Sequence, residues 1–436
     1  MMISQVGRTR RSWWQRSWWL AAFLASLLVV AVRGGAIWLQ RSALAEDPDG
    51  YRLLADTWSR HGVFGLSDSV RDTAADAGNL QPTAYRPPAY PLTLAAVSGR
   101  GPVTPMTIGV LHLGLGTATV LLVWWLGRSW GLAPPRAALA AALVASDPIL
   151  LRQSALVMSE TLAALLAAGA LAGLTSLARK PNLSRAAVTG FLLGLCVLCR
   201  PTFVAWLVLT AAVLPWFPAL KGRRGAHLLA LLAGAGLVIA PWAVRNHLQL
   251  GRPVLTTTHG GYTLLLGNNP YFYAWLGDGR RSAAWRVDDS PLERDLSAAA
   301  GAGADDELAR DRTAYRLARQ SIAAEPGRFL QSCLTRVGWL WSPLPQRVEP
   351  QESRGTRLLR YAVAAWYSAV LLAAGVGLWT LGRDAFRPPW LWGVLLCAAF
   401  TAVHLLYWSN LRMRAPLMPF VCLAAAAGGH NRRVGV

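Results

Sequence analysis

Long apolar stretches separated by short polar ones fill most of the chain, and many have the length that crosses a bilayer. A transmembrane helix needs about 20 predominantly apolar residues. The pattern predicts about ten such helices, over residues 18–39, 105–126, 136–152, 154–177, 186–199, 202–218, 226–244, 361–381, 390–407 and 415–427. The expected fold class is therefore an all-α polytopic membrane protein.

Two longer polar regions interrupt this pattern, and each is expected to be an exterior loop region that contains short amphipathic helices. The expected parts are a cytoplasmic N-terminal tail (1–17), a transmembrane module of about seven helices with exterior loop 41–104 (18–244), a large exterior loop (245–360), and C-terminal helices with a short cytoplasmic tail (361–436).

The first loop region opens with an amphipathic pattern. Tyr51, Leu54, Ala55 and Trp58 share one helical face, which predicts a short helix lying in the membrane interface. Residues 328–341 show the same kind of pattern. The stretch 278–312, rich in Asp, Ala and Gly, is instead expected to be a mobile polar loop.

Composition and charge support a membrane protein and set its orientation. Hydrophobic residues make up 54% of the chain and charged residues 15%, whereas about 25% of a soluble protein is charged. With the N-terminus inside, 16 basic residues fall on short inside segments, and 19 of the 22 acidic residues fall in the two long loops. We therefore expect a multi-pass protein of the bacterial cytoplasmic (inner) membrane, surrounded by membrane lipids, with both termini cytoplasmic.

Three local features of the sequence are interpreted as having no functional role. The net charge of +21 comes mostly from Arg between apolar blocks, with no base-reading motif, so nucleic acid is excluded as a partner. Ala43-Leu44-Ala45 resembles a signal-peptide cleavage site, but it lies too far beyond the apolar run, so the first helix is expected to remain as an anchor. Cys196 and Cys199 lie inside an apolar segment without a second pair and are interpreted as core residues, not metal ligands.

Two acidic residues are candidates for chemistry. Asp47 precedes Pro48, which predicts a helix start with the carboxylate as N-cap and Pro at the first helical position. The same position would place a carboxylate just above the membrane, with Asp49 as its local competitor. Glu160 begins an apolar run, where a charge costs about 2.5–3.5 kcal/mol at the bilayer centre. Its carboxylate needs a water-filled cavity or a charged partner. Asp147 and Arg152 lie close in sequence and could be that partner in a structural ion pair.

Several Arg residues recur at outer membrane ends, against the positive-inside pattern. Snorkelling explains one or two of them, whereas four together more naturally bind an anion such as phosphate. Those four are Arg200, Arg245, Arg412 and Arg414. Arg86 and Tyr90, in "TAYRPPAYP", would also be presented near the outer interface, although this segment could equally be a rigid connector.

The segment 256–270 adds His259, Asn268 and Asn269, with glycines that permit close backbone approach. A lone His is more often structural than a ligand. A divalent cation held by His259 and a carboxylate is conceivable but not indicated, and no metal site is predicted.

The landmarks in order resemble the polytopic glycosyltransferases of the GT-C superfamily. These landmarks are Asp47 four residues before Tyr51, "RPPAYP", "SDP", "SETL", "GFLLGLCVLCRP", "PWAVRN" and "RMRAPLMP". The resemblance is closest to the branch containing dolichyl-phosphate-mannose-protein mannosyltransferases and bacterial lipid A aminoarabinose transferases. That family often has two adjacent acids, Asp-Glu, in its first loop, so the aligned residue here could be Asp47 or, less well, Asp49. Its second acidic position corresponds to Glu160.

The resemblance implies transfer of a sugar from a polyprenyl-phosphate-linked donor to an acceptor glycan, lipid or protein on the exterior face, typically with inversion. Asp47 would act as the base, and Glu160 would orient an Arg or touch the sugar. The phosphate clamp would come from Arg86, Arg200, Arg245, Arg412 and Arg414. Tyr51, Tyr90, His259 and Asn268 complete the expected substrate-binding residues. No cofactor is required, and a divalent metal is optional.

Two other functions fit part of the pattern. An O-antigen-type ligase or polymerase would use exterior Arg and His residues and would not need Asp47. A lipid-linked sugar transporter or flippase would line a path through the membrane with its charges, whereas here the charges crowd one side.

Overall fold

The computed structural model describes residues 29–67, 80–99, 101–217, 220, 222–278, 284–301, 306–347 and 351–428. The predicted tail 1–17 and residues 18–28 of the first predicted span lie outside them. Regular structure in the described residues is almost entirely helical, and the one sheet is a two-stranded antiparallel hairpin of β1 (Gly65–Ser67) and β2 (Leu80–Pro82). The all-α prediction is confirmed.

Each predicted apolar stretch contains a helix. These are Val29–Leu39, α4 (Pro105–Ser129), α5 (Pro134–Ala145), α6 (Pro148–Ser154), α7 (Glu160–Arg179), α8 (Leu183–Cys199), α9 (Phe203–Val213), α10 (Arg224–Leu250), α16 (Arg354–Leu381), α17 (Trp390–Leu406) and α18 (Met418–Ala426). Four helical segments in the described part are long and apolar enough to cross a membrane: α4, α7, α10 and the segment that contains α16. The chain is thus an integral membrane protein, while the count of ten spans stays a prediction.

The predicted helix 136–152 is broken in two, which corrects the sequence prediction. Asp147 is extended because Pro148 follows it, and its carboxylate Oδ1 accepts a hydrogen bond of 2.8 Å from the Leu150 backbone N–H. α5 therefore ends at Ala145, and α6 begins afresh at Pro148.

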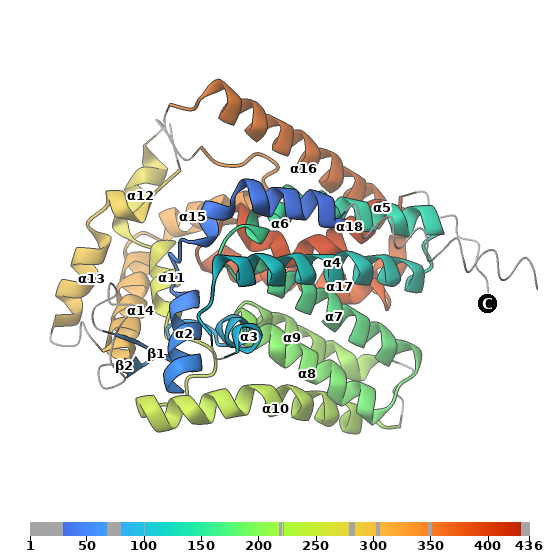
Figure 1. The fold of residues 1–436 in the computed structure, drawn as a ribbon, viewed down its shortest axis with the longest axis horizontal. Helices are drawn as coiled ribbons and strands as arrows, with labels where there is room; N and C mark the ends of the chain where they lie inside the picture. Colours follow the sequence, from blue (N-terminus) through green and yellow to red (C-terminus); the bar gives the residue numbers. More distant parts are fainter. Residues whose placement is uncertain are drawn as a thin grey trace, which may run out of the picture.

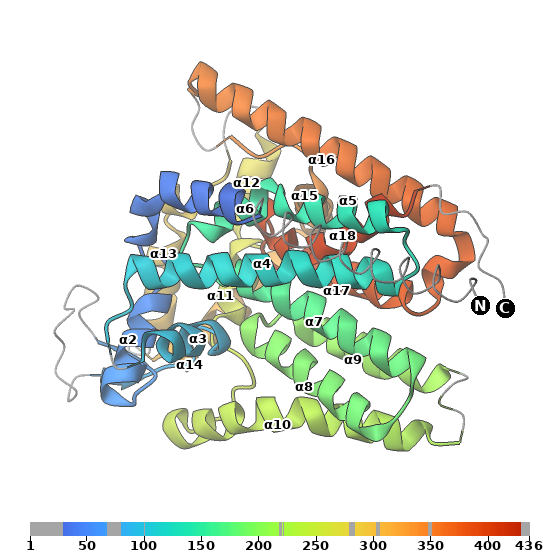
Figure 2. The same cartoon turned by 45° about the vertical axis from the view of Figure 1, so that its right-hand side comes forward.

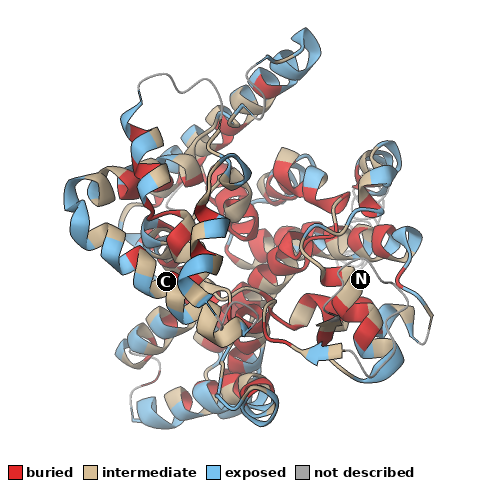
Figure 3. Ribbon diagram, turned by 90° about the vertical axis from the view of Figure 1, so that its left-hand side faces the viewer, coloured by how far each residue is buried: buried red, intermediate tan, exposed pale blue. Residues whose placement is uncertain are grey.

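Small residues let the membrane helices pack closely, while apolar side chains cover their outer faces. A Cβ atom on Gly190 of α8 would lie 1.8 Å from the Leu231 carbonyl oxygen of α10, so only glycine fits there. Buried residues run through the centre of the molecule (Figure 3), and leucines such as Leu229, Leu237 and Leu372 are exposed. Such outward apolar faces suit a lipid surrounding.

The two long loops fold into short elements. The first contains η1 (Arg41–Leu44), α2 (Tyr51–His61), the β1–β2 hairpin and α3 (Ala89–Ser98). The second contains α11 (Gly260–Leu266), α12 (Pro270–Gly277), η5 (Val287–Asp289), α13 (Leu292–Ala300), α14 (Glu307–Ala324) and α15 (Pro326–Trp341). Shorter 3₁₀ segments are η3 (Leu214–Trp216), η7 (Gly382–Phe386) and η8 (Leu411–Leu417).

Both loops gather at one end of the helical bundle. α2, the hairpin, α13 and α14 lie together at the left of Figure 1, and the same grouping is seen in Figure 2. Hydrogen bonds join them, since the carboxylate of Glu307 in α14 accepts from Thr83 Oγ1 at 2.5 Å and from the Ala84 N–H at 3.0 Å. This shared end is where the candidate residues meet.

The loop predictions have mixed outcomes. Helix α2 buries Tyr51, Leu54 and Ala55 as predicted, but Trp58 is 41% exposed and Thr57 is buried instead. The second predicted amphipathic segment, residues 328–341, lies within helix α15. The expectation of a mobile loop over 278–312 is wrong for the described residues, because Leu292 and Leu296 make an apolar face that packs α13 against Ala314 and Ala318 of α14.

Candidate functional site

Asp47 lies in a turn at the start of α2, with one carboxylate oxygen held and the other unpaired. The Gly50 N–H donates to the Asp47 carbonyl oxygen at 3.2 Å, and Gly50 has a φ of 71°, which a residue with a side chain rarely adopts. Asp47 Oδ2 accepts from the Leu53 N–H at 3.0 Å, whereas the buried Oδ1 has no partner among the described residues. The prediction of Asp47 as N-cap and Pro48 as first helical residue is therefore wrong: Gly50 is the N-cap and α2 begins at Tyr51, although the Asp47 carboxylate still binds the first turn through Leu53.

The surroundings of Asp47 favour a basic carboxylate. Burial raises the pKa of Asp47, while the backbone N–H groups of the first turn of α2 and the charge of Arg52 lower it less. A carboxyl group with a raised pKa is a stronger base than an ordinary aspartate. The turn therefore combines a fixed position with increased basicity.

Two tyrosines stand next to this turn. The rings of Tyr51 and Tyr90 meet edge to face with centroids 5.2 Å apart. Tyr90 Oη lies 2.8 Å from His112 Nε2, and His112 Nδ1 lies 3.0 Å from the Ser154 carbonyl oxygen. The charges of both Asp47 and Glu160 act on the Tyr90 hydroxyl.

Glu160 binds two arginines at the first turn of α7. Its Oε1 lies 2.9 Å from Arg200 Nη1 and 3.7 Å from Arg412 Nη1. Its Oε2 is buried and unpaired within the described structure. Because one carboxylate faces two guanidinium groups, this part of the site carries an excess positive charge, which suits an anion.

The expectation that Asp147 and Arg152 could be the partners of Glu160 is wrong. Asp147 Oδ1 accepts from Tyr367 Oη at 2.9 Å, and Arg152 donates to Gln40. The break between α5 and α6 uses the Asp147 carboxylate as a helix cap, so it is not available to α7.

Tyr51 connects the two halves of the site. The charges of Arg86, Asp49, Arg200 and Glu160 all act on its hydroxyl. Arg86 donates to the Asp49 carboxylate at 2.6 Å and to the Asp49 carbonyl oxygen at 3.0 Å. We use the name Tyr51 cluster for the residues grouped around Tyr51 and Tyr90 by the ring contacts, ion pairs and charges described above: Asp47, Asp49, Tyr51, Arg86, Tyr90, Glu160, Arg200 and Arg412.

Two of the predicted arginines lie elsewhere and bind backbone carbonyls. Arg245 donates to the carbonyl oxygens of Thr83 at 2.8 Å and Phe64 at 2.6 Å, which ties the hairpin to α10. Arg414 is fully buried, donates to Ser342 O at 2.7 Å, and stacks 4.0 Å above the Tyr367 ring. Neither contacts a residue of the Tyr51 cluster through a described hydrogen bond or ion pair.

The candidate residues of segment 256–270 lie in two different places. Asn268 is buried, with its amide donating to Leu264 O at 2.8 Å and Leu406 O at 2.9 Å, and with Arg336 donating to its Oδ1. His259 lines a separate cavity, with its ring 4.5 Å from that of Tyr85. Within the described residues no three His, Cys, Asp or Glu side chains converge as a metal site.

Comparison with known proteins places the fold. No protein-family model and no curated protein matches the chain. Solved structures of oligosaccharyltransferase from Archaeoglobus fulgidus do match. The form tethered to an acceptor peptide has TM-score 0.53 and 14% identity over 95% of this chain, and the complex with an inhibitory peptide and a dolichol-phosphate has 0.51 and 15% over 95%. The chain therefore shares the fold of these structures over most of its length.

The chain spans about half the length of these structures, covering 50% of each. Within this fold, the residues of the Tyr51 cluster come from the turn before α2, the start of α3, the first turn of α7, the end of α8 and η8. Sequence reasoning missed His112, although a lone His inside the apolar α4 was its signal. It also missed Asp49 as the partner of Arg86, because only the fold brings these two positions together.

Proposed function

We propose that this chain is a membrane glycosyltransferase that moves a sugar from a polyprenyl-phosphate-linked donor to an acceptor on the exterior face, with inversion and with Asp47 as base. The observation that carries the proposal is the buried, unpaired Oδ1 of Asp47 in the same cluster as the two arginines on Glu160. A buried oxygen without a partner costs about 1–3 kcal/mol. A substrate hydroxyl that donates to it would remove that cost.

The proposed reaction uses the Asp47 carboxylate for the acceptor and the arginines for the phosphate of the donor. The acceptor hydroxyl donates to Asp47 Oδ1 and loses its proton to it as its oxygen attacks the anomeric carbon. The bond from that carbon to the phosphate oxygen breaks on the opposite side, and the lipid phosphate leaves. Arg200 and Arg412 bind the developing negative charge, and Arg86 borders the same space. The leaving group is already a phosphate, so the reaction requires no redox cofactor, and a divalent cation is optional.

Arg245 and Arg414 are left out of the proposed clamp because both donate to backbone carbonyl oxygens. Glu160 orients the two clamp arginines. One neighbour was solved with a dolichol-phosphate, which supports a lipid-linked donor here. Assignment to the mannosyltransferase and aminoarabinose transferase branch, and location in a bacterial cytoplasmic membrane with both termini inside, remain part of this proposal.

A deletion strain tests the function. Mass spectrometry of its envelope glycans and glycolipids should show one missing sugar, restored by the wild-type gene and not by Asp47→Asn. The matched control is Asp384→Asn, an exposed acid paired with Arg387 at 3.5 Å outside the cluster, which should restore the sugar. Full restoration by Asp47→Asn would contradict the proposal and favour a ligase. Movement of labelled lipid-linked sugar in proteoliposomes without a new glycosidic bond would instead establish a transporter.

A further inference from the structure

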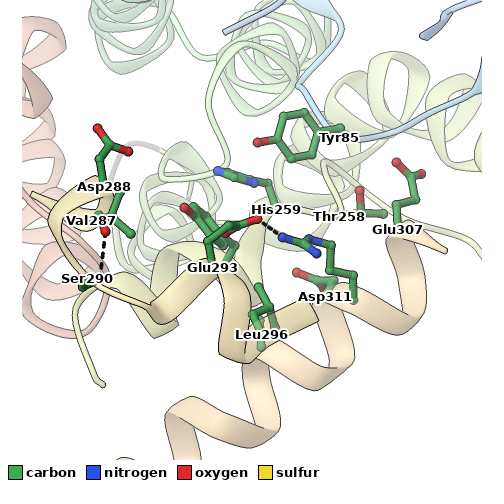
Figure 4. A pocket seen from close by; sticks show the side chains of 13 residues that line it. Tyr85, Thr258, His259, Val287, Asp288, Ser290, Glu293, Leu296, Glu307 and Asp311 are labelled. Atoms are coloured by element: carbon green, nitrogen blue, oxygen red, sulfur yellow. Dashed lines mark hydrogen bonds and ion pairs between the residues drawn. The ribbon is translucent and has the colours of Figure 1, made fainter. Parts of the chain in front are cut away.

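A cavity of about 390 Å³ lies between the segment before α3 and helices α11, α13 and α14 (Figure 4). Its volume falls in the range of about 300–1,000 Å³ that is usual for small-ligand sites. Tyr85, His259 and Tyr262 supply aromatic surface, with the His259 ring 4.5 Å from Tyr85 and 4.9 Å from Tyr262.

The walls of the cavity are fastened to one another. The Thr258 N–H donates to Ala84 O at 3.0 Å, and Glu307 of α14 accepts from Thr83 and Ala84. On the other side, Asp311 Oδ1 accepts from the Gly261 N–H at 2.6 Å. Because these bonds cross between segments distant in sequence, the cavity is a preformed space.

The cavity is strongly acidic. Among its described lining residues are four carboxylates, Asp288, Glu293, Glu307 and Asp311, and one guanidinium, Arg310, which pairs with Glu293. Burial, helped by Arg86 and Arg310, lowers the pKa of His259 to about 3, so this ring adds no positive charge at neutral pH. Burial and the charge of Glu307 raise the pKa of Asp311 to about 6. The uncompensated negative charge favours a cationic ligand.

An independent sign of a ligand comes from Thr258. Thr258 is only 6% exposed and lines the cavity, yet its Oγ1 has no hydrogen-bond partner in the described part of the chain. Buried hydroxyl groups are normally paired. A polar group of a ligand in the cavity would provide the missing bond.

Arg86 connects this cavity to the Tyr51 cluster. Its guanidinium carbon lies 4.6 Å from the centre of the Tyr85 ring, in the cavity wall, and 5.7 Å from the centre of the Tyr51 ring. One side chain therefore lies close both to the Tyr85 wall of the cavity and to Tyr51. A ligand in the cavity could extend past Arg86 and present a hydroxyl group to Asp47.

We propose that the cavity is a subsite for an amine-bearing saccharide, with the ammonium group at Glu293 and Asp311, the ring hydroxyls at Thr258 and Glu307, and the sugar face on Tyr85 and Tyr262. Carboxylates accept strong hydrogen bonds from ammonium and hydroxyl donors, and tyrosine faces attract ammonium groups. That this saccharide is the acceptor rests on the proposed function, whereas its binding does not.

The test measures binding of defined probes to the full-length protein in lipid nanodiscs. The probes are the β-1,4-linked glucosamine trimer, its fully N-acetylated form, and trilysine. Wild type should bind the glucosamine trimer about 10-fold or more tightly than the acetylated form, since the loss of one charge-assisted bond has that order of effect. Asp311→Asn and Thr258→Val should each weaken binding of the trimer, with melting temperatures no lower than that of wild type showing that both variants fold.

The control is Asp384→Asn, outside both the cavity and the Tyr51 cluster, which should bind the trimer like wild type. Equal binding of the free and acetylated trimers, or unchanged binding by both cavity variants, would overturn the proposal. Tighter binding of trilysine would overturn the saccharide class and indicate a basic peptide. If the trimer binds but the chain transfers no sugar, the proposed function fails and the binding site stands. If the chain transfers sugar but does not bind the trimer, the binding site fails and the proposed function stands.

Discussion

Glu160 Oε1 lies 2.9 Å from Arg200 Nη1, and this ion pair joins the first turn of α7 to the end of α8. Arg412 approaches the same oxygen from η8 at 3.7 Å. The pair is almost fully buried, but Arg412 is one-third exposed. The two arginines should therefore respond differently to mutation, although both are proposed to bind phosphate.

Arg200→Ala should destabilise the protein, because it leaves Glu160 buried without its nearest cation. Breaking a buried ion pair in this way costs about 3–5 kcal/mol, measurable as a large fall in melting temperature in nanodiscs. Glu160→Gln combined with Arg200→Ala should recover much of the loss, since the orphan charge is removed. An unchanged melting temperature for Arg200→Ala would contradict the buried pair.

Arg412→Ala should instead leave stability nearly unchanged and weaken donor use. Loss of one hydrogen bond to a charged group corresponds to about a 10- to 100-fold fall in kcat/KM for the lipid donor. Steady-state transfer assays at varied donor concentration would measure it. Wild-type kcat/KM in this variant would exclude Arg412 from the clamp.

Arg245→Ala should loosen the hairpin. The side chain donates to Phe64 O at 2.6 Å and to Thr83 O at 2.8 Å, so its removal leaves two carbonyl oxygens without their charged donor. Hydrogen exchange should rise in residues 80–86 and stay constant in α7. Lost transfer with unchanged exchange would show that Arg245 acts on the substrate, as the sequence alone suggested.

Asp311→Asn should stabilise the protein, and more at pH 8 than at pH 4. The pKa of this carboxyl is raised to about 6 in the folded chain, so the folded state holds its proton more tightly than the unfolded state. Its contribution to the free energy of unfolding therefore falls as pH rises from about 4 to 6. Melting temperatures of wild type, Asp311→Asn and the exposed control Asp384→Asn would measure the effect. A gain that does not depend on pH would contradict it.

The helices could be predicted from sequence because lipid allows few other structures. α4, α7 and α10 appear where the apolar runs place them. The closeness of Asp47 and Tyr51 could also be predicted, since both belong to one turn and helix start. The partner of Glu160 could not, because Arg200 and Arg412 reach it only through the packing of α7, α8 and η8.

The roles of Arg245 and Arg414 could not be predicted, because a sequence does not show which backbone carbonyl groups are left for a side chain to bind. Arg414 binds the Leu340 and Ser342 carbonyl oxygens where α15 ends, and Arg245 binds those flanking the hairpin. Both look like outer-face phosphate ligands in the sequence. The cavity at His259 was missed for a related reason, because Glu307 and Asp311 share a helix face only once residues 307–324 are known to form α14.

The most direct test of the account is the pH dependence of transfer by wild type, Asp47→Asn and Asp384→Asn, with the donor identified from the deletion strain and release of lipid phosphate measured. Base catalysis needs the ionised carboxylate, and burial raises the pKa of Asp47, so wild-type kcat/KM should rise with pH through a value above that of an ordinary aspartate. Asp47→Asn should be slower by about 100- to 10,000-fold and lack that rise, while Asp384→Asn follows wild type. An Asp47→Asn enzyme with the wild-type rate and profile would contradict the central claim.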